Sequence, residues 1–332
     1  MSTSNFSSLL QRFFTDRLLG QLGASAHTVA CYRDAFRLLL GFAVQHLGRE
    51  PSNLQWEELD ATFLCRFLEY LERDRRNAVR TRNNRLSALH AFFRYVALNE
   101  PALVLHCQRI LAIPAKRYDR NPVEFLTEEE SAALVAAPDL GTWIGRRDRA
   151  LLVLAIQTGL RNSEITSLRW QDVGISTGAH VRCLGKGRKT RCTPLRPEVV
   201  TVLKTWLSEQ GGDPVDPVFP SSRGGHLSAD ALQRLVARHV TTARRACPSL
   251  VGKTVTPHTL RHAAAMALLR NGVDLSVIAL WLGHESMETT QIYLHADMQI
   301  KERALTHSAS CGVAPPDRFH PQDPLLAFLE NL

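Results

Sequence analysis

Six residues between positions 161 and 293 have side chains of the types needed to break a phosphodiester bond. They are Arg161, Lys186, His258, Arg261, His284 and Tyr293. Breaking this bond without a metal ion requires a nucleophile, cations around the non-bridging oxygens and an acid for the departing oxygen. Tyrosine supplies a nucleophilic hydroxyl, arginine a fixed cation and lysine a proton. We therefore treat the six residues as a candidate catalytic set.

The two arginines are suited to hold the charge of a phosphoryl transition state. A guanidinium binds two phosphate oxygens at once and stays charged at any working pH, which suits Arg161 and Arg261. The hydroxyl of Tyr293 has an ordinary pKa of about 10, so it needs an adjacent base or cationic surroundings before it attacks phosphorus. Lys186 lies between two glycines, where a mobile ammonium could protonate a departing 5′ oxygen.

The segments that carry these residues resemble the signature motifs of a known family. TGLRNSEI, GKGRK, HTLRH, LGH and TTQIYLH are similar to the motifs of the tyrosine recombinases, the phage integrase family. They occur in the same order, and the resemblance covers about residues 5 to 305. It implies a cycle in which Tyr293 forms a 3′-phosphotyrosyl bond and frees a 5′ hydroxyl, after which another strand's 5′ hydroxyl reseals the DNA. It also implies His258 as acid/base partner and His284 as hydrogen-bond partner of a phosphate oxygen.

Each residue alone has a structural explanation. Tyr293 could be a half-buried helix residue, Arg161 could pair with Glu164, and Lys186 could be an exposed turn residue. His258 could begin a helix, Arg261 could be solvated or salt-bridged, and His284 could cap the preceding helix. The ordered combination favours the catalytic interpretation.

Apolar periodicity predicts helices in the first part of the chain. Val29, Tyr32, Phe36 and Leu39 recur at three- and four-residue steps within residues 25–44, which marks one face of a helix. Similar patterns predict helices near residues 6–19, 57–73 and 86–96. We expect residues 1–112 to form a helical core DNA-binding domain, as the family resemblance implies.

The segment 113–123 contains two prolines and several charges and is typical of a linker. Residues 124–305 are then the catalytic domain. Thr127 and Glu130 predict a capping box and a helix over 128–136. Further helices are expected over 148–157, 161–168 and in most of 228–305, with a β-hairpin over 181–195. The fold class is mainly α with a small β-sheet or hairpin: a helical core-binding domain followed by an α+β catalytic domain.

Other basic residues are candidates for contact with the DNA backbone. Arg82 and Arg85 lie in a dense arginine run, and Arg188 and Lys189 lie on the hairpin with Arg191. A solvated charged face is the alternative for each group. Contacts of this kind position a protein on DNA without specifying the sequence.

Composition agrees with a nucleic-acid partner. The net charge is +8 and the pI about 9.4, which suits double-stranded DNA better than a membrane surface. The chain has no apolar run of about 18 residues and no signal-peptide pattern, so we expect it in the cytoplasm. The seven cysteines form no C-x-x-C pair, and no carboxylates cluster in a way that would hold two magnesium ions. We therefore expect reduced thiols, no metal site and no cofactor.

Several questions stay open at this level. Residues 306–332 could be a disordered end or could dock on a neighbouring subunit, and the resemblance implies a tetramer on two DNA sites, with a partner recombinase or accessory protein as a further option. The biological role could be integration or transposition of a mobile element or Xer-like resolution. Three other functions remain: a catalytically silent DNA-binding regulator, a type IB topoisomerase-like enzyme, and a hydrolytic phosphodiesterase.

Overall fold

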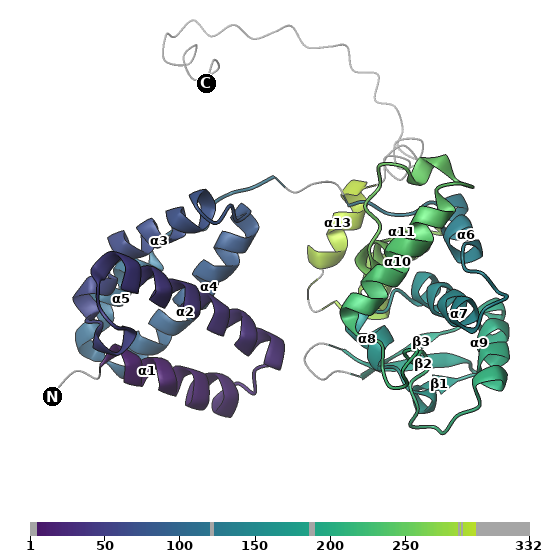
Figure 1. The fold of residues 1–332 in the computed structure, drawn as a ribbon, viewed down its shortest axis with the longest axis horizontal. Helices are drawn as coiled ribbons and strands as arrows, with labels where there is room; N and C mark the ends of the chain where they lie inside the picture. Colours follow the sequence, from purple (N-terminus) through teal and green to yellow (C-terminus); the bar gives the residue numbers. More distant parts are fainter. Residues whose placement is uncertain (1–4, 120–122, 186–189, 285, 287, 297–332) are drawn as a thin grey trace, which may run out of the picture. The chain divides into compact units, whose positions relative to one another are not determined.

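The computed structural model describes residues 5–119, 123–185, 190–284, 286 and 288–296. The chain divides into two compact units, Met1–Arg120 and Asn121–Leu332. In its described residues the first unit is built from helices, and the second packs helices against a small sheet at its edge (Figure 1). The predicted class, mainly α with a small sheet, is confirmed. In the described parts of the chain, no helix is long and apolar enough to span a membrane.

The first unit is a helical bundle built on aromatic side chains. Its elements are α1 (Phe6–Arg12), the π-helix Phe13–Gln21, α2 (Ala26–Leu47), α3 (Ala61–Arg73), α4 (Val79–Asn99) and α5 (Val104–Leu111), with short 3-10 turns at Pro51–Asn53, Trp56–Leu59 and Pro101–Leu103. Phe92 lies edge-on to Phe6, Phe13 and Phe36, with ring centroids 5.7, 5.4 and 5.2 Å away. Edge-to-face pairs add about 0.5–1.5 kcal/mol each to the burial of their area.

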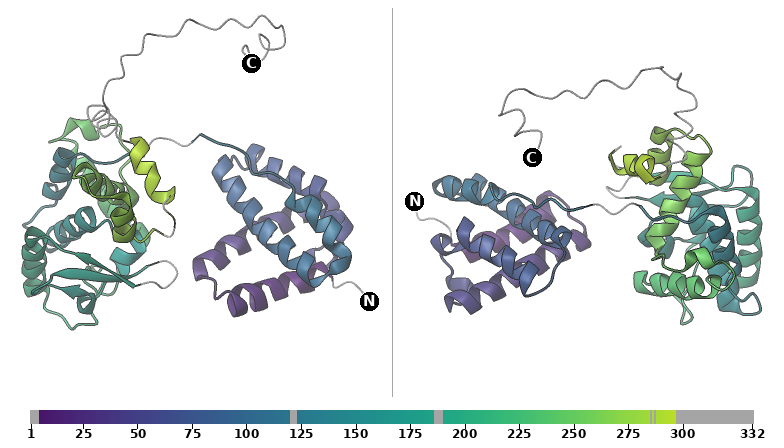
Figure 2. Two further views of the ribbon diagram at one scale, coloured as in Figure 1. Left: turned by 180° about the vertical axis from the view of Figure 1, so that it is seen from behind. Right: turned by 90° about the horizontal axis from the view of Figure 1, so that it is seen from above.

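The second unit places helices around a three-stranded antiparallel sheet. The elements are α6 (Glu128–Ala136), α7 (Trp143–Thr158), α8 (Asn162–Ser167), a 3-10 turn (Trp170–Asp172), β1 (Val173–Gly174), β2 (His180–Leu184), β3 (Thr190–Pro194), α9 (Pro197–Gln210), α10 (Ala229–Ala243), a 3-10 turn (Pro248–Leu250), α11 (Pro257–Arg270), α12 (Leu275–Leu282) and α13 (Glu288–Ala296). The strand order is β1-β2-β3, and Cys183 pairs with Arg191 across the hairpin. Figure 2 shows the same unit from behind and from above.

Local signals account for several of these elements. Thr127 and Glu130 form the predicted capping box, with the Thr127 hydroxyl accepting from the Glu130 amide and Glu130 accepting from the Thr127 amide. Thr256 caps α11, and Pro257 occupies its first turn, where a missing N–H costs nothing. Pro257 therefore begins this helix.

A buried ion cluster joins α7 to α10. Asp148 is fully buried; it accepts from Arg147 at 2.6 Å and lies 2.8 Å from Nε2 of His239. Arg147 also donates to the carbonyl of Pro220 at 2.9 Å. The carboxylate thus balances a buried guanidinium and links two helices that are far apart in the sequence.

We expect Asp148→Asn to lower the free energy of unfolding by about 3–5 kcal/mol, because the change leaves the charge of Arg147 buried without its carboxylate. Urea denaturation followed by circular dichroism measures this. The matched control is Asp213→Asn, since Asp213 is exposed. Equal losses from the two substitutions would contradict the role given to Asp148.

Candidate active site

The chain makes a tight turn between α7 and α8, and this turn places Arg161. Gly159 ends α7 with a φ of 64°. A β-carbon on it would lie 2.8 Å from a methyl of Leu282 and 3.0 Å from Cβ of Ala264. Glycine is therefore required both by the left-handed backbone and by the close approach of α11 and α12.

Arg161 begins α8 and is fixed on two sides. Its guanidinium donates to Oε1 of Glu164 at 3.0 Å and to the carbonyl of Gly283 at 2.6 Å. Glu164 also accepts from the backbone amide of Arg161 at 2.7 Å. The arginine side chain is still 28% exposed. Arg161 is thus oriented by a carboxylate, as the sequence suggested for it in isolation, and remains reachable from solvent.

Arg191 on β3 completes this arrangement. It donates to both carboxylate oxygens of Glu164, at 2.8 and 2.7 Å, and to the carbonyl of Trp281 at 3.1 Å. Burial alone would raise the pKa of Glu164, but the hydrogen bonds from Arg191 and from the Arg161 amide outweigh it and hold the pKa below its usual value. The guanidinium of Arg191 is thus committed to a buried carboxylate, which gives no support to a DNA contact by this residue.

Arg261 lies deeper in the site. It is 2% exposed, and it donates to the carbonyls of Gly159 and Leu282, both at 2.7 Å. Burial and the nearby charge of Arg161 lower its pKa to about 10, so it stays charged at neutral pH. Arg261 therefore links the α7–α8 turn to the end of α12 through hydrogen bonds.

His284 follows the left-handed Gly283 that ends α12. Its Nδ1 lies 2.7 Å from the hydroxyl of Thr290, and its ring stacks on Tyr293 with centroids 6.4 Å apart. Burial and the charges of Arg261 and Arg161 lower the pKa of His284 to about 4, so it is neutral near pH 7. Because Nδ1 is engaged by Thr290, Nε2 is the nitrogen suited to meet a phosphate oxygen.

Tyr293 on α13 is 1% exposed. Burial raises its pKa to about 12, although the charge of Arg261 acts in the opposite direction. Its hydroxyl oxygen lies 3.0 Å from Nδ1 of His262 on α11. The His258 ring lies one helical turn earlier, with its centroid 4.4 Å from that of His262. His258 itself is exposed at the start of the helix.

The structure brings together five of the six candidate residues, namely Arg161, His258, Arg261, His284 and Tyr293. Lys186 lies outside the described residues, as do Arg188 and Lys189. Three residues of this site were not among the catalytic candidates: His262, Arg191 and Thr290. His262 had a signal in the sequence, since it follows Arg261 directly and lies four positions after His258, on the same helical face.

The two arginines named in the first unit differ in their surroundings. Arg82 is 5% exposed and donates to the carbonyl of Pro114 at 3.1 Å, so its side chain packs α4 against the segment after α5. This burial gives no support to a phosphate contact by Arg82. Burial and the charge of Arg75 lower the pKa of Arg85. One of its terminal nitrogens is buried with no hydrogen-bond partner among the described residues.

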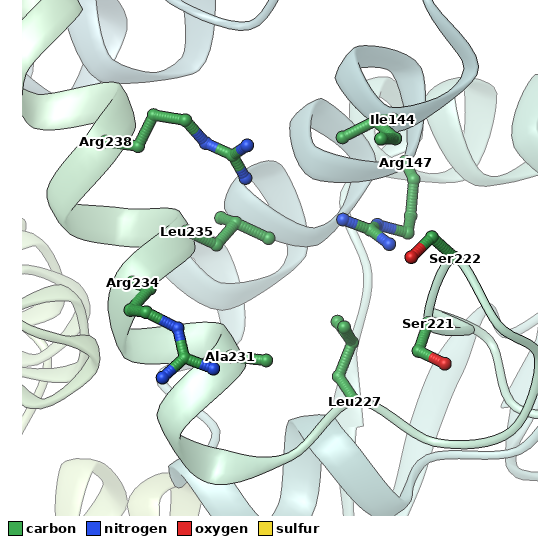
Figure 3. Close-up of a pocket in the computed structure, with 9 residues that line it drawn as sticks. All are labelled: Ile144, Arg147, Ser221, Ser222, Leu227, Ala231, Arg234, Leu235 and Arg238. Carbon is green, nitrogen blue, oxygen red and sulfur yellow. The ribbon is translucent and has the colours of Figure 1, made fainter.

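A pocket of about 420 Å³ lies elsewhere in the second unit, between α7, α10 and residues 221–227 (Figure 3). Arg147, Arg234 and Arg238 surround it, together with Ser221 and Ser222. None of the five candidate residues lines it. Arg147 already donates hydrogen bonds to Asp148 and to the carbonyl of Pro220. We therefore assign this pocket no part in the chemistry.

Comparison with known proteins decides the family. The model of the phage integrase family matches residues 124–300, and that of the N-terminal SAM-like domain of phage integrases matches residues 10–99. The chain belongs to the phage integrase family, the tyrosine recombinases.

Individual members of this tyrosine recombinase family are similar to the chain over 85% or more of its length. A putative integrase/recombinase, y4rC of Sinorhizobium fredii, is 50% identical over 329 residues, 99% of each chain. Tyrosine recombinase XerD of Pseudomonas putida is 33% identical over 287 residues, 85% of this chain and 91% of that one. The solved Tn1549 transposon integrase, in complex with transposon right end DNA, shares the fold, with a TM-score of 0.68 at 15% identity over 91% of this chain and 98% of that chain.

Proposed function

We propose that the chain cuts and rejoins double-stranded DNA at specific sites through a covalent bond between Tyr293 and a 3′ phosphate. The observation that carries this proposal is the convergence of the Tyr293 hydroxyl, two guanidiniums and two histidines around the α7–α8 turn and the end of α12. The family membership of the chain agrees with it.

Each residue has a distinct role in the proposed reaction. Tyr293 attacks phosphorus, and the P–O5′ bond breaks. Arg161 and Arg261 bind the non-bridging oxygens, His284 hydrogen-bonds one of them through Nε2, and His258 takes part in proton transfer. Lys186 protonates the 5′ oxygen. The bond energy is kept in the phosphotyrosine, so resealing by a 5′ hydroxyl needs no ATP and no metal ion.

The two units divide the work in this proposal. Residues 1–112 act as the core DNA-binding domain, with Arg85 on the backbone, 113–123 as the linker and 124–305 as the catalytic domain. Residues 306–332 dock on a neighbouring subunit in a tetramer that holds two DNA sites. The role is movement of a mobile element or Xer-like resolution in the cytoplasm, and y4rC, XerD and the Tn1549 integrase support this range by their names.

A direct test isolates the covalent intermediate. The protein is incubated with nicked DNA from the flanks of its own gene, denatured and digested, and the peptide that carries a nucleotide is identified by mass spectrometry. We expect the nucleotide on Tyr293, joined through a 3′ phosphate. Binding without any adduct would favour the alternative, a DNA-binding regulator of the same fold that performs no chemistry.

We expect Lys186→Ala to slow cleavage of ordinary DNA by about 10²–10⁴-fold, because the departing 5′ oxygen then lacks its acid. A substrate with sulfur at the 5′ bridging position needs no proton on leaving, so the variant should cleave it at close to the wild-type rate. Adduct formation on the two substrates measures this. Lys204→Ala, on α9, is the control. Equal losses on both substrates would remove Lys186 from the role of acid.

A further inference from the structure

Within the part of the chain that the structure describes, the side chain of His262 touches the nucleophilic oxygen. Its Nδ1 lies 3.0 Å from the hydroxyl oxygen of Tyr293, within hydrogen-bond distance, and the ring planes meet at 66°. A candidate general base must lie within reach of the proton that it removes. His262 meets this requirement directly, while the structure shows His258 in ring contact with His262.

The local fold explains why His262 faces Tyr293. His258, Arg261 and His262 are spaced at three and four residues along α11, so they share the face that meets α12 and α13. Tyr293 belongs to a small core with Ala265, Met266, Ile278 and Leu282. These residues bring α13 onto α11 and leave the hydroxyl at Nδ1. The contact is therefore a product of helix packing.

We propose that His262, rather than the neighbouring His258, accepts the proton of Tyr293 during DNA cleavage, a step that rests on the function proposed above. The Tyr293 hydroxyl donates to Nδ1 of a neutral His262 that carries its own proton on Nε2. As the bond from the tyrosine oxygen to phosphorus forms, the proton passes to Nδ1 and the P–O5′ bond breaks. The 5′ oxygen takes a proton from Lys186. On resealing, the imidazolium of His262 returns its proton to the leaving tyrosine oxygen.

The electrostatic surroundings fit this role. Burial, together with His258 and Arg261, lowers the pKa of His262 to about 4, so the ring is neutral and free to accept near pH 7. Tyr293, with a pKa of about 12, is almost entirely protonated there. Proton transfer from Tyr293 to His262 in the protein without DNA is therefore unfavourable. It becomes favourable only as the oxygen bonds to phosphorus and loses its basicity, so that no free tyrosinate has to form.

The titratable and charged groups around His262 come from three parts of the unit. His258 and Arg261 lie on α11 itself, Tyr293 comes from α13, and His284 comes from the turn after α12. A phosphate bound by the arginines would add negative charge close to the imidazole and stabilise its protonated form. DNA itself thus strengthens the base at the moment of attack.

The test uses the full-length protein on nicked DNA that carries its site. The two variants are His262→Ala, which removes the ring, and His262→Asn, which keeps a hydrogen-bond acceptor near the position of Nδ1 but takes no proton. We expect both to bind DNA like the wild type and to cleave it about 10²-fold or more slowly. The defect should persist on the 5′-sulfur substrate that restores Lys186→Ala. His180→Asn is the matched control, since His180 lies on β2 and its Nδ1 lies 2.8 Å from the carbonyl oxygen of Gly178.

Two outcomes would overturn the assignment. Wild-type cleavage by His262→Asn would mean that a hydrogen bond suffices and that no proton is accepted. Recovery of either variant on the 5′-sulfur substrate would place His262 on the side of the leaving group. Failure of the proposed function is distinguishable from both, because the wild-type protein would then form no adduct at all.

Discussion

We expect Tyr293→Phe to bind DNA with wild-type affinity and to form no covalent adduct. The substitution removes one oxygen from a side chain that is otherwise packed among Ala265, Met266, Ile278 and Leu282, so the fold keeps its core. Without the oxygen the site loses its proposed nucleophile, and we expect cleavage to fall by more than about 10⁴-fold.

This result is measured on denaturing gels with labelled DNA, next to gel shifts of the same samples. The control is Tyr70→Phe in the first unit, which makes the same chemical change on α3. An adduct that persists in Tyr293→Phe would assign the nucleophile elsewhere. Loss of DNA binding would show instead that the hydroxyl supports the fold.

Arg191→Met should lower the stability of the protein and should also slow cleavage. It leaves the carboxylate of Glu164 buried with only part of its former partners, and breaking a buried ion pair in this way costs about 3–5 kcal/mol. Arg161 then loses the carboxylate geometry that orients it, and β3 loses its attachment to the carbonyl of Trp281. Thermal denaturation and adduct formation measure the two effects.

A double variant separates the two effects of Arg191. Arg191→Met combined with Glu164→Gln removes both charges but keeps an acceptor for the Arg161 amide. We expect it to recover much of the stability while cleavage stays slow. Arg182→Met, on the neighbouring strand, is the control, since Arg182 is half exposed and its nearest carboxylate contact, to Asp172, is 3.4 Å. Full recovery of cleavage in the double variant would contradict a positioning role for Arg191.

The sequence predicted best what depends on neighbouring residues. The capping box at Thr127 and Glu130 gave the start of α6, and the glycine-containing turn predicted the β2–β3 hairpin. The first helix of the chain was expected over residues 6–19, where the structure has α1 and then a π-helix. The helices α5 and α9 and the short strand β1 were not predicted, because their patterns are short or their partners are distant.

The site was harder to predict wherever a side chain serves a residue far along the chain. Arg191 looked like another cation of a basic hairpin, because Glu164 lies 27 positions earlier. Arg82 looked exposed within its arginine run, while its carbonyl partner, Pro114, follows 32 positions later. His262 lies within the motif HTLRH, but its contact with Tyr293 is visible only in the fold, where α13 packs against α11. The kind of reaction could be inferred from the residue types, but the hydrogen bonds between distant residues could be seen only in the fold.

The small core that holds Tyr293 has a consequence for the local stability of α13. The second unit has a large core of residues from α6 to α11 and a separate cluster of five buried residues under α13. Segments held by few buried apolar contacts open at a lower free energy than the whole domain unfolds. We therefore expect α13 to open locally while the rest of the unit stays folded, so that exchange of hydrogen for deuterium should reach the amides of α13 well before those of α7.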